Sequence, residues 1–342
     1  MWGLTMLLPA PRGPMTTGLI RALRADDPTS LPDAVPVADP LADDDLQLAL
    51  WICFELHYRG FADVAERWEW HPDLIAFRGE LEAQLLAALR RDVTVPSGEA
   101  PVAQRLRDLV DGDDGPQLSR HMQQRADREQ FAEFAVHRSI YQLKEADPHT
   151  WAVPRLTGRA KAALVEIQVD EYGDGDPARM HSELYRQFLR GLDLDDGYGA
   201  YVDAVPGITL AIGNVMSLFG LRRSLRGALV GHLAAYEMTS SEPCRRIAKG
   251  LRRLGADDAT CAFYDVHVTA DALHEQLAAH DLCGGLAEAE PELTEDIVFG
   301  AAACLHVDNR FAEHVSGCWR DGRSSLRADD VVTTARPLAE VS

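Results

Sequence analysis

Apolar residues recur at helical spacing along most of the chain. From Asp43 onward they return every three or four positions, as in the segments 45–58 and 71–92. This spacing predicts amphipathic helices that turn one face toward a core. The segment 71–92 also opens with His-Pro-Asp and has two arginines just before its last residue, which suits a helix because of its macrodipole. Further helical segments are predicted over 128–146, 149–173, 178–192, 208–221, 222–255, 259–282 and 293–322.

The segments between these helices are short, and none of them predicts a sheet. No run of alternating apolar and polar residues is long enough for a convincing strand. Breaks such as 172–177 and 192–199 are rich in glycine and aspartate and connect helices. We therefore expect an all-α bundle of about seven core helices in one domain over residues 43–325. Residues 1–42, in which Met1 and Met15 are both candidate starts, predict a mobile N-terminal arm, and residues 326–342 a C-terminal tail.

Composition narrows the class of protein. The chain has 342 residues, of which 46% are hydrophobic, enough for a sizeable core. With 34 basic and 54 acidic residues the net charge is −20, which disfavours nucleic acid and anionic membrane surfaces as partners. No apolar run reaches the roughly 18 residues that a membrane span needs. The six cysteines form no Cys-x-x-Cys pair, so we expect free thiols in the cytoplasm rather than a zinc site or disulfide framework.

The segment 265–276 carries the first candidate chemistry. In a helix, His267, Asp271 and His274 fall at i, i+4 and i+7, within roughly 60° of one another around the axis. Apolar neighbours indicate that this helix is largely buried. These three side chains form a solvated helix face, a polar patch in a core, or the ligands of one site. A zinc-protease motif is excluded because Ala278 stands where the second histidine would be, and the paired Glu-x-x-His motifs of ferritin-like proteins are absent.

Three other segments supply residues of the same chemical kind. Glu171 lies in VDEYGDG at a helix end, His181 opens the next helix, and Glu237 lies in the middle of a later one. The order of these residues along the chain, followed by His267, Asp271 and His274, resembles that of the haem-oxygenase-like diiron oxidases, and the resemblance covers roughly residues 45–320. Glu145 stands where some members of that family have an additional carboxylate. The resemblance implies a site for two Fe²⁺ ions with the ligands Glu171, His181, Glu237, His267, Asp271 and His274, and Glu145 as a further candidate.

The resemblance also implies an activity. Iron that must bind O₂ is suited to imidazole and carboxylate ligands with open positions, and such a site uses O₂ as co-substrate without haem. The resemblance implies a free amino acid or a fatty acid as substrate, and we expect an aliphatic amine-bearing one, a free amino acid in natural-product biosynthesis, oxidised by C–H cleavage that leads to desaturation, fragmentation or ring closure. Glu145 keeps N-oxygenation as an alternative. An external electron donor and a homodimer are further expectations. His306, Asp308 and Arg310 on the last predicted helix are candidates for facing a substrate, and Arg310 is the candidate for binding a carboxylate, although a surface salt bridge explains Arg310 better.

Plainer interpretations stay open for each residue taken alone. Asp170 or Glu166 can take the place assigned to Glu171, and a glutamate such as Glu145, near a helix end, is usually solvated. Two interpretations belong to other classes of protein. One is a haem-binding protein on the same bundle, which would need an axial histidine near its start. The other is a metal-free helical binding protein.

Overall fold

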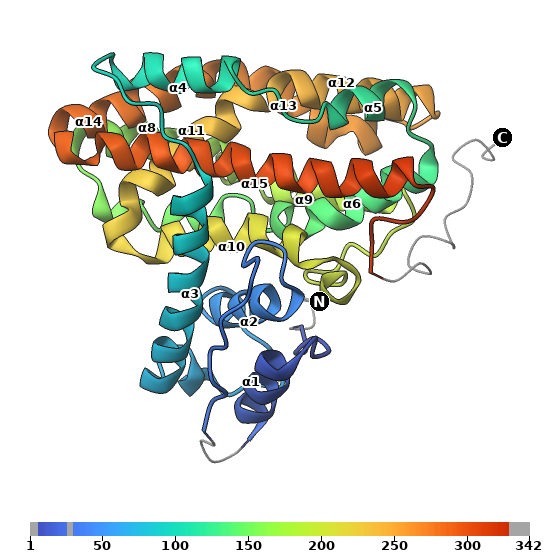
Figure 1. Cartoon of the computed structure of the whole chain (residues 1–342). Helices are drawn as coiled ribbons and strands as arrows, with labels where there is room; N and C mark the ends of the chain where they lie inside the picture. The colour runs from blue at the N-terminus through green and yellow to red at the C-terminus, as the bar shows by residue number, and fades with distance from the viewer. Residues whose placement is uncertain (1–5, 26–29, 328–342) are drawn as a thin grey trace.

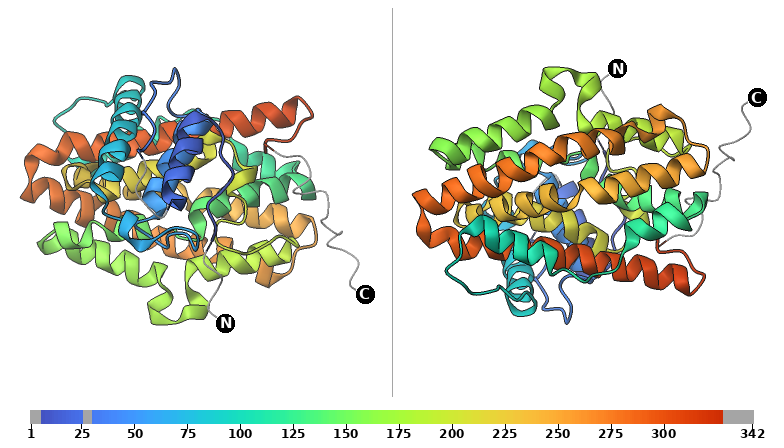
Figure 2. Two further views of the ribbon diagram at one scale, coloured as in Figure 1. Left: turned by 90° about the horizontal axis from the view of Figure 1, so that it is seen from below. Right: turned by 90° about the horizontal axis from the view of Figure 1, so that it is seen from above.

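The computed structural model describes residues 6–25 and 30–327, and within that range it does not describe the side chains of residues 269–273. Throughout the described ranges the regular structure is helical, without a strand, so the all-α prediction is confirmed. The helix α15 runs along the bundle in Figure 1, with α4, α5, α12 and α13 on one side of it and α1, α2 and α3 on the opposite side. The two views of Figure 2, from below and from above, bring these two sets of helices to the front in turn.

The α-helices follow one another along the chain with short connections. Their bounds are α1 (Pro14–Arg24), α2 (Asp44–Glu55), α3 (Pro72–Asp92), α4 (Val102–Asp111), α5 (Leu118–Gln124), α6 (Arg128–Gln142), α7 (Asp147–Thr150), α8 (Gly158–Glu171), α9 (His181–Gly191), α10 (Gly207–Leu221), α11 (Arg226–Thr239), α12 (Ser241–Arg253), α13 (Asp258–Gln276), α14 (Gly285–Ala289) and α15 (Thr294–Arg320). A π-helical segment, η7 (Leu277–Gly284), joins α13 to α14. Short 3₁₀ turns are η1 (Glu66–Trp68), η2 (Val153–Arg155), η3 (Gly173–Gly175), η4 (Pro177–Arg179), η5 (Val202–Ala204), η6 (Arg223–Leu225) and η8 (Pro291–Leu293).

The centre of the bundle is formed by α10, α11 and α15. Every residue of α10 from Gly207 to Gly220 is buried, as expected for a helix that is apolar on all sides. At the crossing of α11 and α15, a side chain at Gly231 would meet the carbonyl oxygen of Ile297, and one at Gly300 would meet that of Ala228. The two backbones therefore approach as closely as they do because glycines lie at the crossing.

Three predicted helices are interrupted, and prolines explain two of the breaks. The predicted helix 222–255 divides at Ser240 into α11 and α12, with Pro243 in the first turn of α12, where a missing N–H costs least. In the segment 149–173, α8 begins only at Gly158, after the turn that contains Pro154. The predicted helix 259–282 ends as α13 at Gln276 and continues as the π-helical segment η7.

The N-terminal segment differs from the expected mobile arm. Residues Pro14–Arg24 form α1, which packs on α2 with Met15, Leu19 and Leu23 buried. The Asp45 carboxylate accepts hydrogen bonds from the backbone N–H groups of Met15 and Thr16 and so holds the start of α1. The spacing of the buried residues is that of an amphipathic helix, a pattern that the proline-rich flanks obscured. Most of the predicted tail 326–342 lies outside the described residues.

Two other expectations concern the environment of the protein. None of the helices in the described ranges is long and apolar enough to cross a bilayer. All six cysteines are free and buried.

Candidate metal centre

Two groups of metal-binding side chains lie in the interior of the bundle. The Glu145 group consists of Glu145, His181 and His267, and the Glu171 group consists of Glu171, Glu237 and His274. Within each group, one ligand atom from each residue lies within 4.8 Å of the other two. The structure thus brings six of the seven predicted ligands together. The seventh, Asp271, is among the residues whose side chains lie outside the described part of the chain.

The histidines of α13 reach both groups because of their spacing. His267 and His274 are seven residues apart, close to two turns of an α-helix, so they point from the same face. His267 then belongs to the Glu145 group and His274 to the Glu171 group. Both side chains are buried. Helical periodicity therefore suffices to direct these two imidazoles into one region of the core.

The connection between α8 and α9 places Glu171 beside His181. Glu171 is the last residue of α8 and His181 the first of α9, and the glutamate Oε2 lies 2.9 Å from the histidine Nδ1. Gly173 allows the chain to turn between them, because its φ is +67° and a Cβ there would lie 2.6 Å from the backbone nitrogen of Met180. This tight turn links the two groups to each other.

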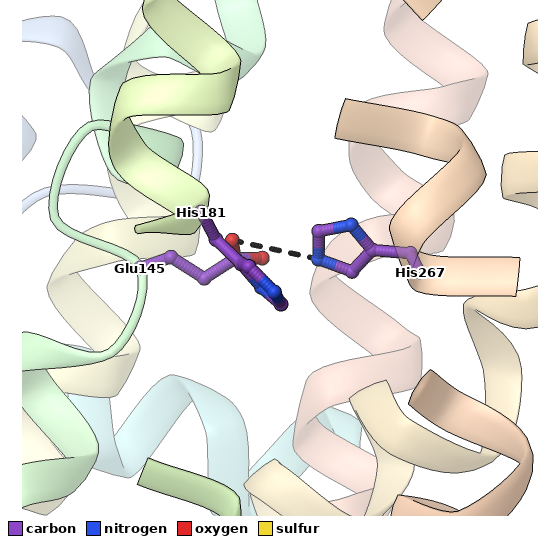
Figure 3. Close-up of side chains that lie close together, drawn as sticks. All are labelled: Glu145, His181 and His267. Atoms are coloured by element: carbon purple, nitrogen blue, oxygen red, sulfur yellow. Dashed lines mark ion pairs between the residues drawn. The ribbon is translucent and has the colours of Figure 1, made fainter. Parts of the chain in front are cut away.

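The Glu145 group gathers around the imidazole of His267. Figure 3 shows Glu145 and His181 on one side and His267 on the other, with His267 Nε2 3.7 Å from Glu145 Oε2. His267 Nδ1 lies 2.6 Å from the carbonyl oxygen of Phe263, which only accepts hydrogen bonds, so Nδ1 carries the proton. In the neutral ring, Nε2 then presents its lone pair toward the group, which is the arrangement found in metal-binding histidines.

Glu145 itself lies in the turn after α6 and is held by a neighbour that the sequence did not indicate. With the amide nitrogen of Gln142 facing the carboxylate, Gln142 donates to both oxygens of Glu145, at 2.6 and 2.8 Å. Its amide oxygen then accepts from the Tyr141 hydroxyl at 2.9 Å. The opposite orientation would place two oxygens against each other. A carboxylate expected to be solvated is thus fixed toward His181 and His267.

The Glu171 group combines two carboxylates with one imidazole. His274 Nδ1 lies 3.3 Å from Glu237 Oε2, and its Nε2 lies 3.2 Å from Oδ2 of Asp170, the residue that the sequence offered as a substitute for Glu171. The side chain of Asp170 is one-third exposed, whereas those of Glu171 and Glu237 are buried. Glu171 is therefore the residue that lies in the group, with Asp170 at its margin.

The electrostatics of both groups favour a positive charge among these carboxylates. Burial lowers the pKa of His274, but contact with Glu237 and the charges of Glu171 and Asp170 raise that pKa to about 8. Burial likewise lowers the pKa of His181, and the charge of Glu171 raises it above its ordinary value. The buried carboxyl of Glu171 has a lowered pKa because the three histidines outweigh its desolvation. A bound cation would meet the same requirement.

Hydrogen bonding provides a direct test of whether these residues suit a metal. Despite their separation of 2.9 Å, His181 Nδ1 and Glu171 Oε2 are buried atoms without a hydrogen bond of acceptable geometry among the described residues. The same is true of His274 Nδ1. Buried polar atoms in native proteins are rarely left in this state, and a bound cation would satisfy them. Imidazole and carboxylate oxygen are ligands that suit iron, so the residues fit it.

A cavity of about 420 Å³ reaches both groups. Its wall includes Glu145, Glu171, Glu237 and His267. The rest of the wall combines aromatic and aliphatic side chains with polar and charged ones. Such a volume lies within the range of roughly 300–1,000 Å³ typical of small-molecule sites. The chain therefore joins its candidate metal ligands to a space that suits a small substrate.

The predicted substrate contact Arg310 lies elsewhere. It is absent from the wall of the cavity, and its Nη2 pairs at 2.6 Å with Oδ2 of Asp39 in the N-terminal segment. Asp308, two residues earlier, does line the cavity. Residues two apart in a helix point about 200° apart, so the face of α15 that presents Asp308 to the cavity directs Arg310 away from it.

Known proteins share this part of the chain. A family model described as iron-containing redox enzyme matches residues 132–309, just over half of the chain, and this range contains both groups of ligands. A nitrosourea synthase of Streptomyces achromogenes subsp. streptozoticus is 25% identical over 190 residues, which amount to 54% of this chain and 40% of that relative. The chain thus matches less than half the length of that relative. The resemblance inferred from the sequence is confirmed: the chain belongs to the family of iron-containing redox enzymes.

Proposed function

We propose that the Glu145 group and the Glu171 group each hold one iron ion and that the protein uses O₂ to oxidise a small amine-bearing substrate, most simply a free amino acid. The observation that carries the proposal is the pair of adjacent groups, each with a histidine and at least one carboxylate. Glu171 and His181, 2.9 Å apart, connect them. Two Fe²⁺ ions bound there would supply the electrons and open positions that O₂ reduction requires.

The residues of the chain prepare this chemistry in three ways. The Phe263 carbonyl fixes the tautomer of His267, and Gln142 orients the carboxylate of Glu145. Burial keeps water from the carboxylates of Glu171 and Glu237, which makes their attraction for a cation stronger than in solvent. The aromatic wall of the cavity confines a substrate beside the ligands and limits access of water.

The type of oxidation is the finer part of the proposal. The family resemblance favours C–H cleavage, which removes hydrogen from carbon. Two observations favour N-oxygenation instead: Glu145 lies in its group as an additional carboxylate, and a relative is named for a nitrosourea, a compound with an oxygen-bearing nitrogen. N-oxygenation places one oxygen atom on nitrogen and releases the other as water, so it takes two electrons from an external donor, which we include in the proposal.

Iron loading tests the proposal most directly. After anaerobic loading with Fe²⁺, we expect about two irons per chain in the wild type and a loss of iron in Glu237→Ala and His267→Ala. His121→Ala serves as the control, because His121 lies on α5 and contacts Gln130 outside both groups, so this variant should load normally. Less than one iron per chain in the wild type, or normal loading of both ligand variants, would overturn the site. A haem absorption band in the pure protein would favour the haem-binding alternative.

Exposure of the loaded protein to O₂ with a panel of amino acids then tests the reaction. Mass spectrometry distinguishes the two types of oxidation, because N-oxygenation adds an oxygen atom whereas desaturation removes two hydrogens. Iron loading without O₂-dependent change in any amino acid would contradict the proposed substrate class and leave the metal site supported.

A further inference from the structure

Arg138 and Asp308 meet in the wall of the cavity that reaches the metal ligands. Arg138 lies on α6 and Asp308 on α15, and Nη1 of the arginine is 2.7 Å from Oδ1 of the aspartate. The arginine side chain is 12% exposed and the aspartate 40% exposed. A cation and an anion thus stand side by side, with the cation the more deeply buried of the two.

The guanidinium of Arg138 is enclosed by rings but poorly supplied with acceptors. Its central carbon lies 4.5 Å from the ring centre of Phe311, 5.4 Å from that of Phe134 and 5.8 Å from that of Tyr141. Among the described residues, Asp308 provides its ion-pair oxygen, and no other acceptor engages its five N–H donors. None of the Arg138 nitrogens is a buried atom without a partner, so the donors that no side chain engages are open to the cavity, where a ligand can accept from them.

Another interhelical arginine shows what a purely structural pair looks like in this protein. Arg105 of α4 binds both carboxylate oxygens of Glu295 on α15, at 2.6 and 3.0 Å, and its Nη2 also donates to the carbonyl of Pro96 at 2.7 Å. That pair does not line the cavity with the metal ligands. Arg105 also has a buried Nε without an acceptor, so the two arginines differ in access: Arg138 presents its free donors to the cavity, which suits a ligand with a carboxylate.

We propose that Arg138 binds the carboxylate and Asp308 the ammonium group of a free α-amino acid, so that the side chain of the substrate, and not its α-amino group, meets the metal ligands. This inference rests on the proposed function and specifies its substrate. A guanidinium binds a carboxylate through two parallel hydrogen bonds, and the partly exposed Asp308 carboxylate can accept from an ammonium group.

The surroundings of the pair agree with a substrate that extends from it toward the metal ligands. Arg138 precedes Gln142, the residue that contacts Glu145, by one helical turn, about 6 Å along the axis. Tyr141 and Tyr236 stack in the wall with ring centres 6.0 Å apart. A side chain of several carbons would lie along these rings and place a remote atom near the ligands.

Binding measurements with three matched compounds test the assignment without relying on turnover. L-Norleucine carries both charged groups, pentylamine lacks its carboxylate, and hexanoate lacks its ammonium group. By anaerobic calorimetry of the iron-loaded protein, we expect norleucine to bind at least about tenfold more tightly than either analogue. L-Lysine and L-arginine extend the panel to longer side chains with a polar end.

The variants assign each charged group to its residue. Arg138→Gln should abolish the preference for norleucine over pentylamine, and Asp308→Asn should abolish the preference for norleucine over hexanoate. Arg105→Gln is the matched control, since it breaks a structural ion pair and should lower stability while both preferences stay at the wild-type ratio. Because each readout is a ratio of affinities, a variant that is only partly folded still gives an answer.

Two results would overturn the assignment. One is that norleucine, lysine and arginine all fail to bind to the wild type. The other is that Arg138→Gln and Asp308→Asn both keep the wild-type preferences for norleucine over pentylamine and over hexanoate. If Arg138→Gln does not fold, the panel on the wild type and on Asp308→Asn still decides. Iron content is measured on the same samples, so failure to load iron, which contradicts the proposed function, is distinguished from failure to recognise an amino acid.

Discussion

Replacement of Gly173 by alanine should weaken iron binding, because this glycine shapes the turn that positions a metal ligand. Gly173 lies in the turn between Glu171 and His181, with a φ of +67°. An alanine Cβ there would lie 2.6 Å from both the carbonyl carbon of Arg179 and the nitrogen of Met180, which are backbone atoms and cannot rotate away. The turn must therefore shift, and the start of α9, with His181, shifts with it.

A control variant two residues away separates the cost of backbone strain from the cost of the clash. Gly175 has a φ of +83°, and a Cβ added there would have no atom within 4 Å, so Gly175→Ala introduces backbone strain without a clash. Left-handed backbone costs an L-residue roughly 1–2 kcal/mol. We expect Gly175→Ala to lose about that much stability, and Gly173→Ala to lose more, because the clash is added to the same strain.

Urea unfolding of the metal-free variants and anaerobic Fe²⁺ titration provide the two measurements. Gly175→Ala should bind iron like the wild type. Gly173→Ala should bind it roughly 10- to 100-fold more weakly, the usual consequence of displacing a residue that orients metal ligands. Equal stability losses and equal iron affinities in the two variants would refute the argument that this turn positions His181.

Two further predictions concern the stability of the metal-free protein. Lys144→Met should destabilise the protein by about 3–5 kcal/mol in urea unfolding, because the buried carboxylate of Glu55, 2.8 Å from the lysine Nζ, loses its counter-charge. Adding Glu55→Gln should recover part of this loss. A Lys144→Met variant as stable as the wild type would contradict the prediction. Burial, with the charges of His314 and Arg138, holds the pKa of His137 well below its ordinary value of about 6.5. Stability is then complete above about pH 6.5 and falls by up to about 1.4 kcal/mol per pH unit below it, since only the unfolded state takes up the proton; His137→Gln should reduce this slope, whereas parallel losses in both proteins would argue against it.

Periodicity predicted the parts of the centre that lie within one helix. His267 and His274 share a face of α13 because seven residues make nearly two turns, and this needs no knowledge of the rest of the chain. The pairing of Glu171 with His181 depends on a turn with a left-handed glycine, so the sequence could indicate both residues but not their contact. Glu145 lies beyond the end of α6, where the direction of a side chain follows from tertiary contacts, here with Gln142.

Helical periodicity in the sequence does not predict contacts between helices that are far apart along the chain. Arg138 and Asp308 are 170 residues apart, and nothing local to either residue indicates the other. The sequence offered His306, Asp308 and Arg310 of the last helix as facing a substrate, with Arg310 as the carboxylate contact, and of these Asp308 lines the cavity. The phase of a helix around its axis is set by the helices it packs against, and in α15 that phase turns Asp308 toward the cavity and Arg310 toward Asp39.

The charges in the cavity wall connect metal binding to substrate binding. Among the described residues, six carboxylates line the cavity against two arginines, so without a metal its wall has an excess of acidic groups that repels a substrate carboxylate. Two bound iron ions would offset the three glutamates among the candidate ligands, so a substrate carboxylate would meet less repulsion on its way to Arg138. The metal would thus do more than supply chemistry: it would let a carboxylate approach Arg138 at all. On this argument, the affinity for norleucine belongs to the iron-loaded protein, because the same cavity without metal attracts the ammonium group and excludes the carboxylate.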